Sequence, residues 1–333
     1  MAGLYLNLNS RLTITDATIG KGVQFDHIAE CEVRRSVVEL GDTATITIPR
    51  RYGKIKDRGI FEYFKVGDKI KLELGYNGEL FTEFTGYLRE IESGYPVRLQ
   101  CDDELYPLRK NSWNKSWQSI KLKQLLNVIV PGYKIECADV NLGKFQIDNA
   151  STIVVLQELK KQYGFSSFLK ENTLYCQFTY DVRGVGDIKT YDFAKNVRKD
   201  KTSLKYRRKE DFKIQIKAIS NNSNGKKTSV TVGSKEKEAS VRTLNFKDKT
   251  EKELRELALK QLDALVFDGF EGTISGFGYP RVQAGDTLKI VNEKEPERNG
   301  SYLVEGVTIK YGNAYYEREC KLSYKQTNTE EVK

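Results

Sequence analysis

The sequence is short of the residues that most enzymes use for acid–base and metal chemistry. It contains a single histidine, His27, in 333 residues. A Ser-His-Asp triad would have to use this residue, and a metal site built on several histidines cannot be assembled. His27 adjoins the polar turn at 24–26, which favours an exposed structural position. Gly-x-Ser-x-Gly and HExxH motifs are absent too. The sequence therefore predicts no enzyme, no metal site and no cofactor.

Cysteines are present, but they form no recognisable pattern. Their number is odd and none belongs to a CxxC pair, which argues against a disulfide framework and against a zinc site. We expect buried thiols in a protein made in a reducing cytoplasm. The five residues are Cys31, Cys101, Cys137, Cys176 and Cys320.

Long apolar runs are missing as well. No stretch approaches the roughly 18–20 apolar residues that a membrane span requires. The N-terminus lacks the basic segment and apolar run of a secretory signal. We therefore expect neither a membrane span nor a leader.

The charge balance is basic, with 55 Lys and Arg against 46 Asp and Glu and a formal net charge of +9. Such a charge suits nucleic acid or an acidic protein surface. The densest cluster is Lys195–Lys209, which we interpret as a solvated or interface face. A nucleic-acid site stays an alternative, because Tyr191, Phe193 and Tyr206 adjoin the cluster and aromatic side chains can stack on bases.

Two other motifs resemble functional sites. Consecutive carboxylates at Asp102-Asp103-Glu104 point to alternate faces of a strand end, which suits neither paired acid–base work nor close metal ligation. We interpret them as a solvated turn. The segment Arg183–Asp187 resembles a phosphate loop only in its glycines, since no Lys-Ser/Thr and no helix follow.

Residues 1–110 show the period-two alternation of β-strands. It is clearest in residues 12–15, 44–48, 70–74 and 97–101. The segment Arg50–Arg58 interrupts it and predicts a long basic loop. Several short strands at this spacing indicate a barrel or sandwich. We therefore assign residues 1–110 to a first tube-like β-barrel domain.

Helical spacing begins after this domain. Apolar residues predict helices over 119–130 and over 152–163, the second ending at Gly164 as a C-terminal cap. A hairpin is expected from 166–169 and 173–178. We assign residues 111–185 to a small α+β insert.

The chain then returns to β-strands. Residues 186–324 are predicted to be a β-rich region with a second tube-like barrel. Thr250 and Glu253 form a capping box that starts a helix at 251–266, which we expect to pack against that barrel. Residues 325–333 read as a polar tail. The predicted fold class is mainly β with an α+β insert.

One short unit occurs near both ends of the chain. Residues 66–72 and 284–290 share the order small/apolar-Gly-Asp-x-apolar-Lys-apolar, with Gly67 and Asp68 in the first copy and Gly285 and Asp286 in the second. In each copy a Gly-Asp turn opens an alternating strand. Such turns are common, but the strands that follow are also alike. The repeat predicts two copies of one barrel and a pseudo-symmetric assembly.

Longer segments carry a family resemblance. Residues 64–78 and 83–91 resemble the first barrel of phage baseplate hub proteins, and 101–110 fits the segment that follows there. Residues 269–286 and 300–307 fit the C-terminal part. The order and spacing of these segments are similar to the late control D / Mu-type tail hub family, related to the T4-type hub, and especially to versions from prophages of Bacteroidetes-like bacteria.

This resemblance implies a structural protein of the virion tail baseplate, in a phage or a related contractile injection system. It implies a homotrimeric ring whose six barrels adapt the six-fold tail tube to a three-fold spike. The implied partners are a spike protein, the tail tube or tail tube initiator, the tape measure protein and baseplate wedge proteins. No needle or lysozyme domain follows the hub segments, so a separate spike is expected.

Two other function classes stay open on the sequence. One is a basic nucleic-acid-binding accessory protein that uses the positive charge. The other is a tail-associated cell-wall hydrolase, which the missing acid–base constellation disfavours.

Overall fold

The computed structural model describes residues 6–17, 20–49, 64–92, 94–178, 186–221, 226–296 and 299–326. These residues form a 13-stranded sheet, a two-stranded sheet and two three-stranded sheets, with three α-helices. The predicted mainly β fold class with α+β parts is confirmed. None of the helices in these ranges is long and apolar enough to cross a membrane.

The first β unit follows the alternation seen in the sequence. In β5, for example, Ile70, Leu72 and Leu74 are buried while the residues between them are not. The predicted basic loop at Arg50–Arg58 lies outside the described residues. The strands are β1 (Leu8–Thr15), β2 (Gly22–Phe25), β3 (Glu30–Ser36), β4 (Thr43–Ile48), β5 (Lys69–Tyr76), β6 (Glu79–Glu92) and β7 (Val97–Asp102).

The second β unit comes from two separate segments of the chain. It contains β13 (Ile188–Asp192), β14 (Ser203–Arg207), β18 (Gly269–Phe277), β19 (Thr287–Val291), β20 (Gly300–Gly312) and β21 (Tyr315–Gln326). Lys325 and Gln326 pair with β20. The last strand therefore reaches two residues into the segment that the sequence assigned to a polar tail.

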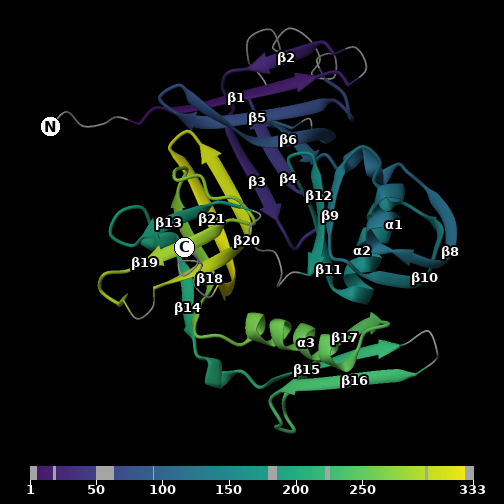
Figure 1. The fold of residues 1–333 in the computed structure, drawn as a ribbon. Helices are drawn as coiled ribbons and strands as arrows, with labels where there is room; N and C mark the ends of the chain where they lie inside the picture. The colour runs from purple at the N-terminus through teal and green to yellow at the C-terminus, as the bar shows by residue number, and fades with distance from the viewer. Residues whose placement is uncertain are drawn as a thin grey trace.

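Both units belong to one continuous sheet. Its strand order is β14-β18-β21-β20-β3-β4-β7-β6-β5-β1-β2, with β19 and β13 branching from β20. Figure 1 shows the purple and blue strands of the first unit running into the yellow-green strands of the second. One apolar core extends under both, from Leu12 and Leu72 to Ile290 and Ile309.

An α/β insert follows the first unit and lies beside it (Figure 1). Its helices are α1 (Leu122–Ile129) and α2 (Thr152–Tyr163), and Gly164 caps α2 in the left-handed conformation, as predicted. The helix expected at 119–130 begins only at Leu122, because residues before it pair with β10. The strands are β8 (Trp113–Lys121), β9 (Lys134–Cys137), β10 (Asn141–Ala150), β11 (Phe165–Lys170) and β12 (Thr173–Phe178); a 3₁₀ turn, η3 (Tyr106–Arg109), precedes them.

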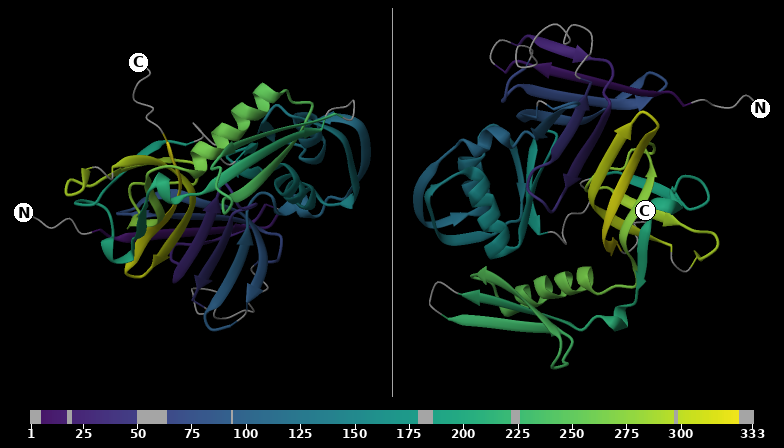
Figure 2. Two further views of the ribbon diagram at one scale, coloured as in Figure 1. Left: turned by 90° about the horizontal axis from the view of Figure 1, so that it is seen from below. Right: turned by 180° about the vertical axis from the view of Figure 1, so that it is seen from behind.

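A second insert interrupts the second β unit between β14 and β18. It consists of β15 (Ile214–Asn221), β16 (Lys227–Gly233), β17 (Ser240–Lys247) and α3 (Glu251–Leu265). The helix was expected to pack against the second barrel, but its contact with that unit is a minor one, with β21. It packs mainly on β15 and β16, where Leu254 and Ala258 are buried, and the three-stranded sheet with α3 forms a separate layer in the two views of Figure 2.

The predicted capping box of α3 is present. The Thr250 hydroxyl accepts from the Glu253 amide at 3.3 Å, and Glu253 accepts from the Thr250 amide at 2.8 Å. The hydrogen bond from the Thr250 backbone lowers the pKa of Glu253 to about 2, and the Lys249 ammonium contributes. These contacts satisfy two amides that the first turn would otherwise leave unpaired.

We expect Thr250→Ala to lower the free energy of unfolding of the α3 layer by about 1 kcal/mol, because the cap oxygen is lost. Hydrogen exchange of the α3 amides measures the effect. Thr250→Ser retains the oxygen and is the control. Equal protection of α3 in the alanine variant and the wild type would contradict the role of the cap.

Candidate assembly surface

The first Gly-Asp turn is held by a compact set of hydrogen bonds. Asp68 Oδ2 accepts from the Lys65 amide at 2.7 Å. The Asp68 amide donates to the Lys65 carbonyl, and the Gly67 amide donates to the Leu88 carbonyl at 2.7 Å. The Leu88 amide in turn donates to the Asp68 carbonyl at 2.8 Å. Gly67 has φ +97°. Glycine adopts such a positive φ readily because it has no Cβ that would clash with the backbone. The turn thereby fixes the start of β5 against β6.

The second Gly-Asp turn repeats these contacts. Asp286 Oδ2 accepts from the Gln283 amide at 2.8 Å, and Gly285 has φ +89°. The Gly285 amide donates to the Val304 carbonyl at 2.8 Å, and the Val304 amide donates to the Asp286 carbonyl at 2.9 Å. Both aspartates are buried, at 6% exposure for Asp68 and 2% for Asp286. The four residues singled out in the sequence therefore occupy equivalent positions.

The strands around the two turns also correspond. The order β5-β6-β7-β4-β3 in the first unit matches β19-β20-β21-β18-β14 in the second, and every neighbouring pair is antiparallel. The long strand of each unit shifts register directly after the residue that bonds the turn, Leu88 in β6 and Val304 in β20. Because bulges are specific features, their recurrence indicates one barrel present twice.

The copies differ at one side strand. In the first unit β1 runs antiparallel to β5, whereas in the second β13 runs parallel to β19. The second turn also holds this side strand. Asp286 Oδ1 accepts from the Asp187 amide at 2.9 Å, and a Cβ on Gly186 would come within 2.2 Å of that oxygen. The Asp286 carboxylate therefore accepts from two backbone amides, one in the turn and one before the side strand, whereas Asp68 accepts from one.

The two copies are joined by a backbone ladder. Strand β3 pairs antiparallel with the second half of β20, in the register Ser36 to Gly306 through Glu30 to Gly312. The first half of β20 pairs with β19 on the same edge. One long strand thus belongs to its own barrel at one end and extends the neighbouring barrel at the other.

A buried ionic contact lies next to this joint. Glu83 of the first copy and Arg318 of the second are both 0% exposed, and Arg318 Nη2 lies 2.6 Å from Glu83 Oε1. The Tyr316 hydroxyl also donates to Glu83 at 3.0 Å, and Arg281 Nε lies 2.9 Å from the same oxygen. Arg318 donates further to the carbonyls of Gly278 and Val282. The contact fixes the two barrels relative to each other.

The pKa of Arg318 reflects two opposing effects. Burial, the largest single effect, lowers it, but the Glu83 carboxylate together with Tyr316 and Tyr191 outweighs burial, and the pKa is raised above its ordinary value. The charge therefore stays on Arg318 in the core. The partners lie 235 positions apart in the chain, and nothing in the local sequence around either one indicates the contact.

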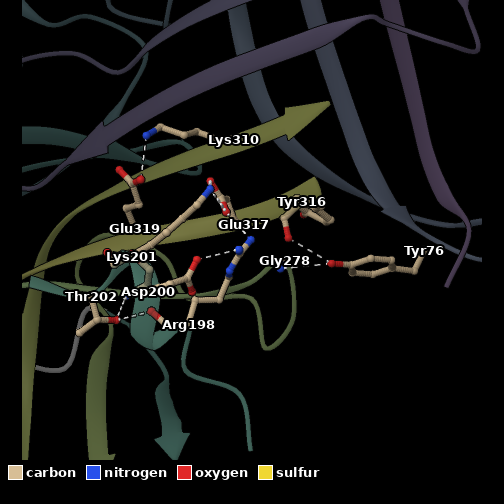
Figure 3. A network of polar contacts seen from close by, with 11 residues as sticks. Tyr76, Arg198, Asp200, Lys201, Thr202, Gly278, Lys310, Tyr316, Glu317 and Glu319 are labelled. Atoms are coloured by element: carbon tan, nitrogen blue, oxygen red, sulfur yellow. Dashed lines mark hydrogen bonds and ion pairs between the residues drawn. The ribbon is translucent and has the colours of Figure 1, made fainter. Parts of the chain in front are cut away.

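A second polar cluster attaches the basic segment to β21. Figure 3 shows Arg198 and Lys201 reaching the carboxylate of Glu317, at 2.9 Å and 2.7 Å, with Lys310 and Glu319 paired nearby. The backbone carbonyl of Arg198 also accepts from the Thr202 hydroxyl at 2.8 Å. These contacts hold η5 (Lys199–Lys201) against the barrel just before β14 begins.

The other candidate sites do not assemble a reactive centre. His27 is exposed, as expected. The expectation that Asp102 and Asp103 form a solvated turn is wrong, because they are 1% and 8% exposed. Arg109 Nη2 lies 3.0 Å from Asp102, and burial raises the pKa of Asp103 to about 7, with the Asp42 charge contributing. The described residues contain no cluster suited to a metal ion, and most of the segment Arg183–Asp187 lies outside them.

The side of the joined sheet that faces away from the core is polar. The Thr45 hydroxyl donates to Gln100 at 2.8 Å, and Gln100 donates to Glu92 at 2.9 Å. A hollow crosses from the first copy to the second on this side, lined by Glu30, Glu32, Thr45, Thr47, Arg98, Gln100, Lys310 and Tyr315 with the buried Cys31 beneath. Both copies therefore contribute to one continuous hydrophilic surface.

Known structures with this fold were found, whereas no protein-family model and no curated protein matches the sequence. A tail protein from Neisseria meningitidis MC58 aligns with a TM-score of 0.62 at 14% identity, over 95% of this chain and 96% of its own. The 43 kDa tail protein of prophage MuSo2 from Shewanella oneidensis gives 0.62 at 13%, over 96% and 98%.

A third similar structure comes from another kind of particle. An Escherichia coli component of the type VI secretion system, itself described as similar to the T4 tail proteins gp27 and gp5, aligns with a TM-score of 0.54 at 10% identity. The alignment covers 95% of this chain and 79% of that one. The chain therefore has the fold of phage tail and related secretion proteins along nearly its whole length.

We expect Glu83→Leu to lower the free energy of unfolding by about 3–5 kcal/mol, because Arg318 keeps a buried charge without its main partner. Adding Arg318→Met should recover much of that loss. A double-mutant cycle by denaturant unfolding measures the coupling, and Lys310→Met on the more exposed Glu319 pair is the control, with an effect of about 0–1 kcal/mol. Additive losses from the two core substitutions would contradict a direct Glu83–Arg318 contact.

The two turns allow a matched comparison. Asp68→Ala removes the acceptor of one backbone amide, and Asp286→Ala removes the acceptor of two, so both should destabilise their barrel by about 1–3 kcal/mol with the larger loss at Asp286. Hydrogen exchange in β5 and β19 reports each site separately. A larger loss at Asp68, or no loss at either site, would be inconsistent with the two hydrogen-bond sets.

Proposed function

We propose that the chain is the structural baseplate hub of a phage tail or a related contractile injection system, working as a homotrimeric ring without catalysis. The observation that supports this most directly is the repeated barrel, with the same turn, the same register shift and the same strand order in both copies. The fold shared with phage tail proteins agrees with it.

The symmetry of the tail explains why each chain would contain two copies of the barrel. A six-fold tube can be continued by three chains only if each chain presents two equivalent units at its end. Three copies of this chain provide six. Repetition around a closed ring also pairs the sheet edges that would otherwise be open to indiscriminate association.

The proposed partners are those that the resemblance to tail hubs implies. In this proposal one end of the ring binds the tail tube or the tail tube initiator, and the other end binds a three-fold spike that is a separate protein. The tape measure protein would meet the lumen, and baseplate wedge proteins would meet the outside, where the two inserts lie. The continuous polar sheet surface suits a water-filled lumen, because its Thr, Gln and paired charged side chains are hydrated without exposing a large apolar patch.

The basic cluster gives little support to the nucleic-acid alternative. Arg198 and Lys201 are engaged with Glu317, and Arg207 with Glu271 at 3.0 Å. Arg207 also lies over the Phe212 ring, 3.6 Å from its centroid. Three of the eight basic residues in the densest basic segment are therefore paired with these two carboxylates of the same chain.

Mass photometry at micromolar concentration should show a species of about 114 kDa, three times the 38.1 kDa chain. Negative-stain micrographs should show rings with a central opening. A strictly monomeric protein, with no rings at any concentration up to the micromolar range, would overturn the hub proposal. Binding to DNA that weakens steeply with salt would favour the alternative instead.

A further inference from the structure

The chain contains a second pair of strand edges that is equivalent to the β3–β20 joint, but in the described residues these two edges are not hydrogen-bonded to each other. The ladders make β14 the equivalent of β3, because Leu204 pairs with Gly272 as Val33 pairs with Ala44. The turn bonds and the register shift make β6 the equivalent of β20. The joined sheet thus contains an edge equivalent to β3, at its end strand β14, and an edge equivalent to the second half of β20, on the outer half of β6.

Both edges are open within the described residues. Beyond Leu88, the outer half of β6 (Glu90–Glu92) pairs only with β7, whereas the corresponding part of β20 is bonded on both sides. Strand β14 pairs only with β18, whereas β3 lies between two strands. Open strand edges carry backbone groups that can pair with another chain.

The internal joint defines a register for the two open edges. Arg34 lies opposite Thr308 in that joint, and Ser36 lies opposite Gly306. The equivalent positions are Lys205 and Arg207 on β14, and Glu92 and Glu90 on β6. Transfer of the register therefore places Lys205 opposite Glu92 and Arg207 opposite Glu90. Cross-strand pairs of opposite charge stabilise antiparallel strands, whereas like charges destabilise them.

One apolar side chain beside the open β6 edge lacks the cover that its equivalent has. Val66 is 57% exposed, whereas its equivalent Ala284 packs against the apolar core that contains the two inserts. A hollow next to this edge is lined by Phe64, Lys65, Val66, Arg89, Glu90 and Ile91.

We propose that the outer half of β6 binds β14 of a second copy of this chain, antiparallel and in the register of the internal β3–β20 joint. The inference rests on the proposed ring and specifies its interface. One chain contributes the acidic edge, with Glu90 and Glu92, and the next contributes the Lys205 ammonium, while Arg207 stays paired with Glu271 of its own chain. The internal joint and the joint between chains then alternate around the ring.

A cysteine pair tests the register. We expect the double variant Glu92→Cys, Lys205→Cys to form disulfides between chains on mild oxidation, giving covalent dimers and trimers on a non-reducing gel. Directly opposed residues bring their Cβ atoms within reach of a disulfide. The matched control, Glu90→Cys with Lys205→Cys, sets the two thiols about 7–8 Å apart on the diagonal and should cross-link much less. The unchanged chain controls for the native cysteines, four of which are buried.

Charge reversal provides a second, independent measurement. Lys205→Glu should weaken association by roughly fivefold or more, and adding Glu92→Lys should restore it, because the pair is reversed rather than broken. Both residues are exposed, so circular dichroism should be unchanged. Arg207 is unsuitable for this test because it also contacts Glu271 and Phe212.

The outcomes separate this inference from the hub proposal. Trimers that form normally but show no preference for the 92–205 cross-link, or prefer 90–205, would overturn the interface and leave the ring intact. Monomers under all conditions would overturn both. A selective 92–205 cross-link, together with rescue by the double charge reversal, would support both.

Discussion

The pairing of β3 with β20 is the constraint on which the rest of the structure depends. A barrel that ended at β3 would leave a row of backbone amides and carbonyls without partners, and β20 is long enough to satisfy them while still serving its own barrel. The ladder therefore merges two units into one sheet over one core. The Glu83–Arg318 contact then makes their relative orientation specific, since a buried carboxylate and guanidinium tolerate little displacement.

The additional modules are placed where they leave this joint undisturbed. The first insert follows β7, after the first barrel is complete. The second replaces the short connection that joins β3 to β4 in the first copy, and it returns the chain to the same barrel at β18. The two inserts pack on each other, as the Phe178–Phe246 ring contact shows, with centroids 6.0 Å apart. The inserts therefore add structure around the barrels without changing the strand order that the two barrels share.

Local patterns in the sequence were sufficient to locate several elements of this fold. Alternation located β5, the capping box located α3 within one residue of its end, and glycine at a left-handed position located the end of α2. The paired Gly-Asp turns also pointed to equivalent positions, because each turn is held by residues near it in sequence or by the next strand. These features depend on short segments whose physical requirements are visible in the residues themselves.

What the sequence did not show depends on residues distant in the chain. Strand β14 was read only as part of a basic cluster, because its alternation is masked by lysine and arginine on an open edge. The partners Glu83 and Arg318 carry no local signal. The burial of Asp102 follows from the arginines that reach it, Arg89 and Arg109, rather than from its own neighbours. The α3 helix was correctly located, but its main packing surface was not predicted, since its apolar stripe does not specify which sheet covers it.

The charges on the open edges have a consequence for how copies of the chain associate. Two β14 edges brought together would place Lys205 and Arg207 against the same residues, and two β6 edges would place Glu90 and Glu92 against themselves. Like charges directly across a ladder are unfavourable, so a two-fold pairing of identical edges is disfavoured. Pairing of β14 with β6 is heterologous, and a heterologous contact propagates until it closes into a ring or continues as a filament. The internal joint already sets the rotation between adjacent barrels, so a joint in the same register repeats that rotation and favours closure.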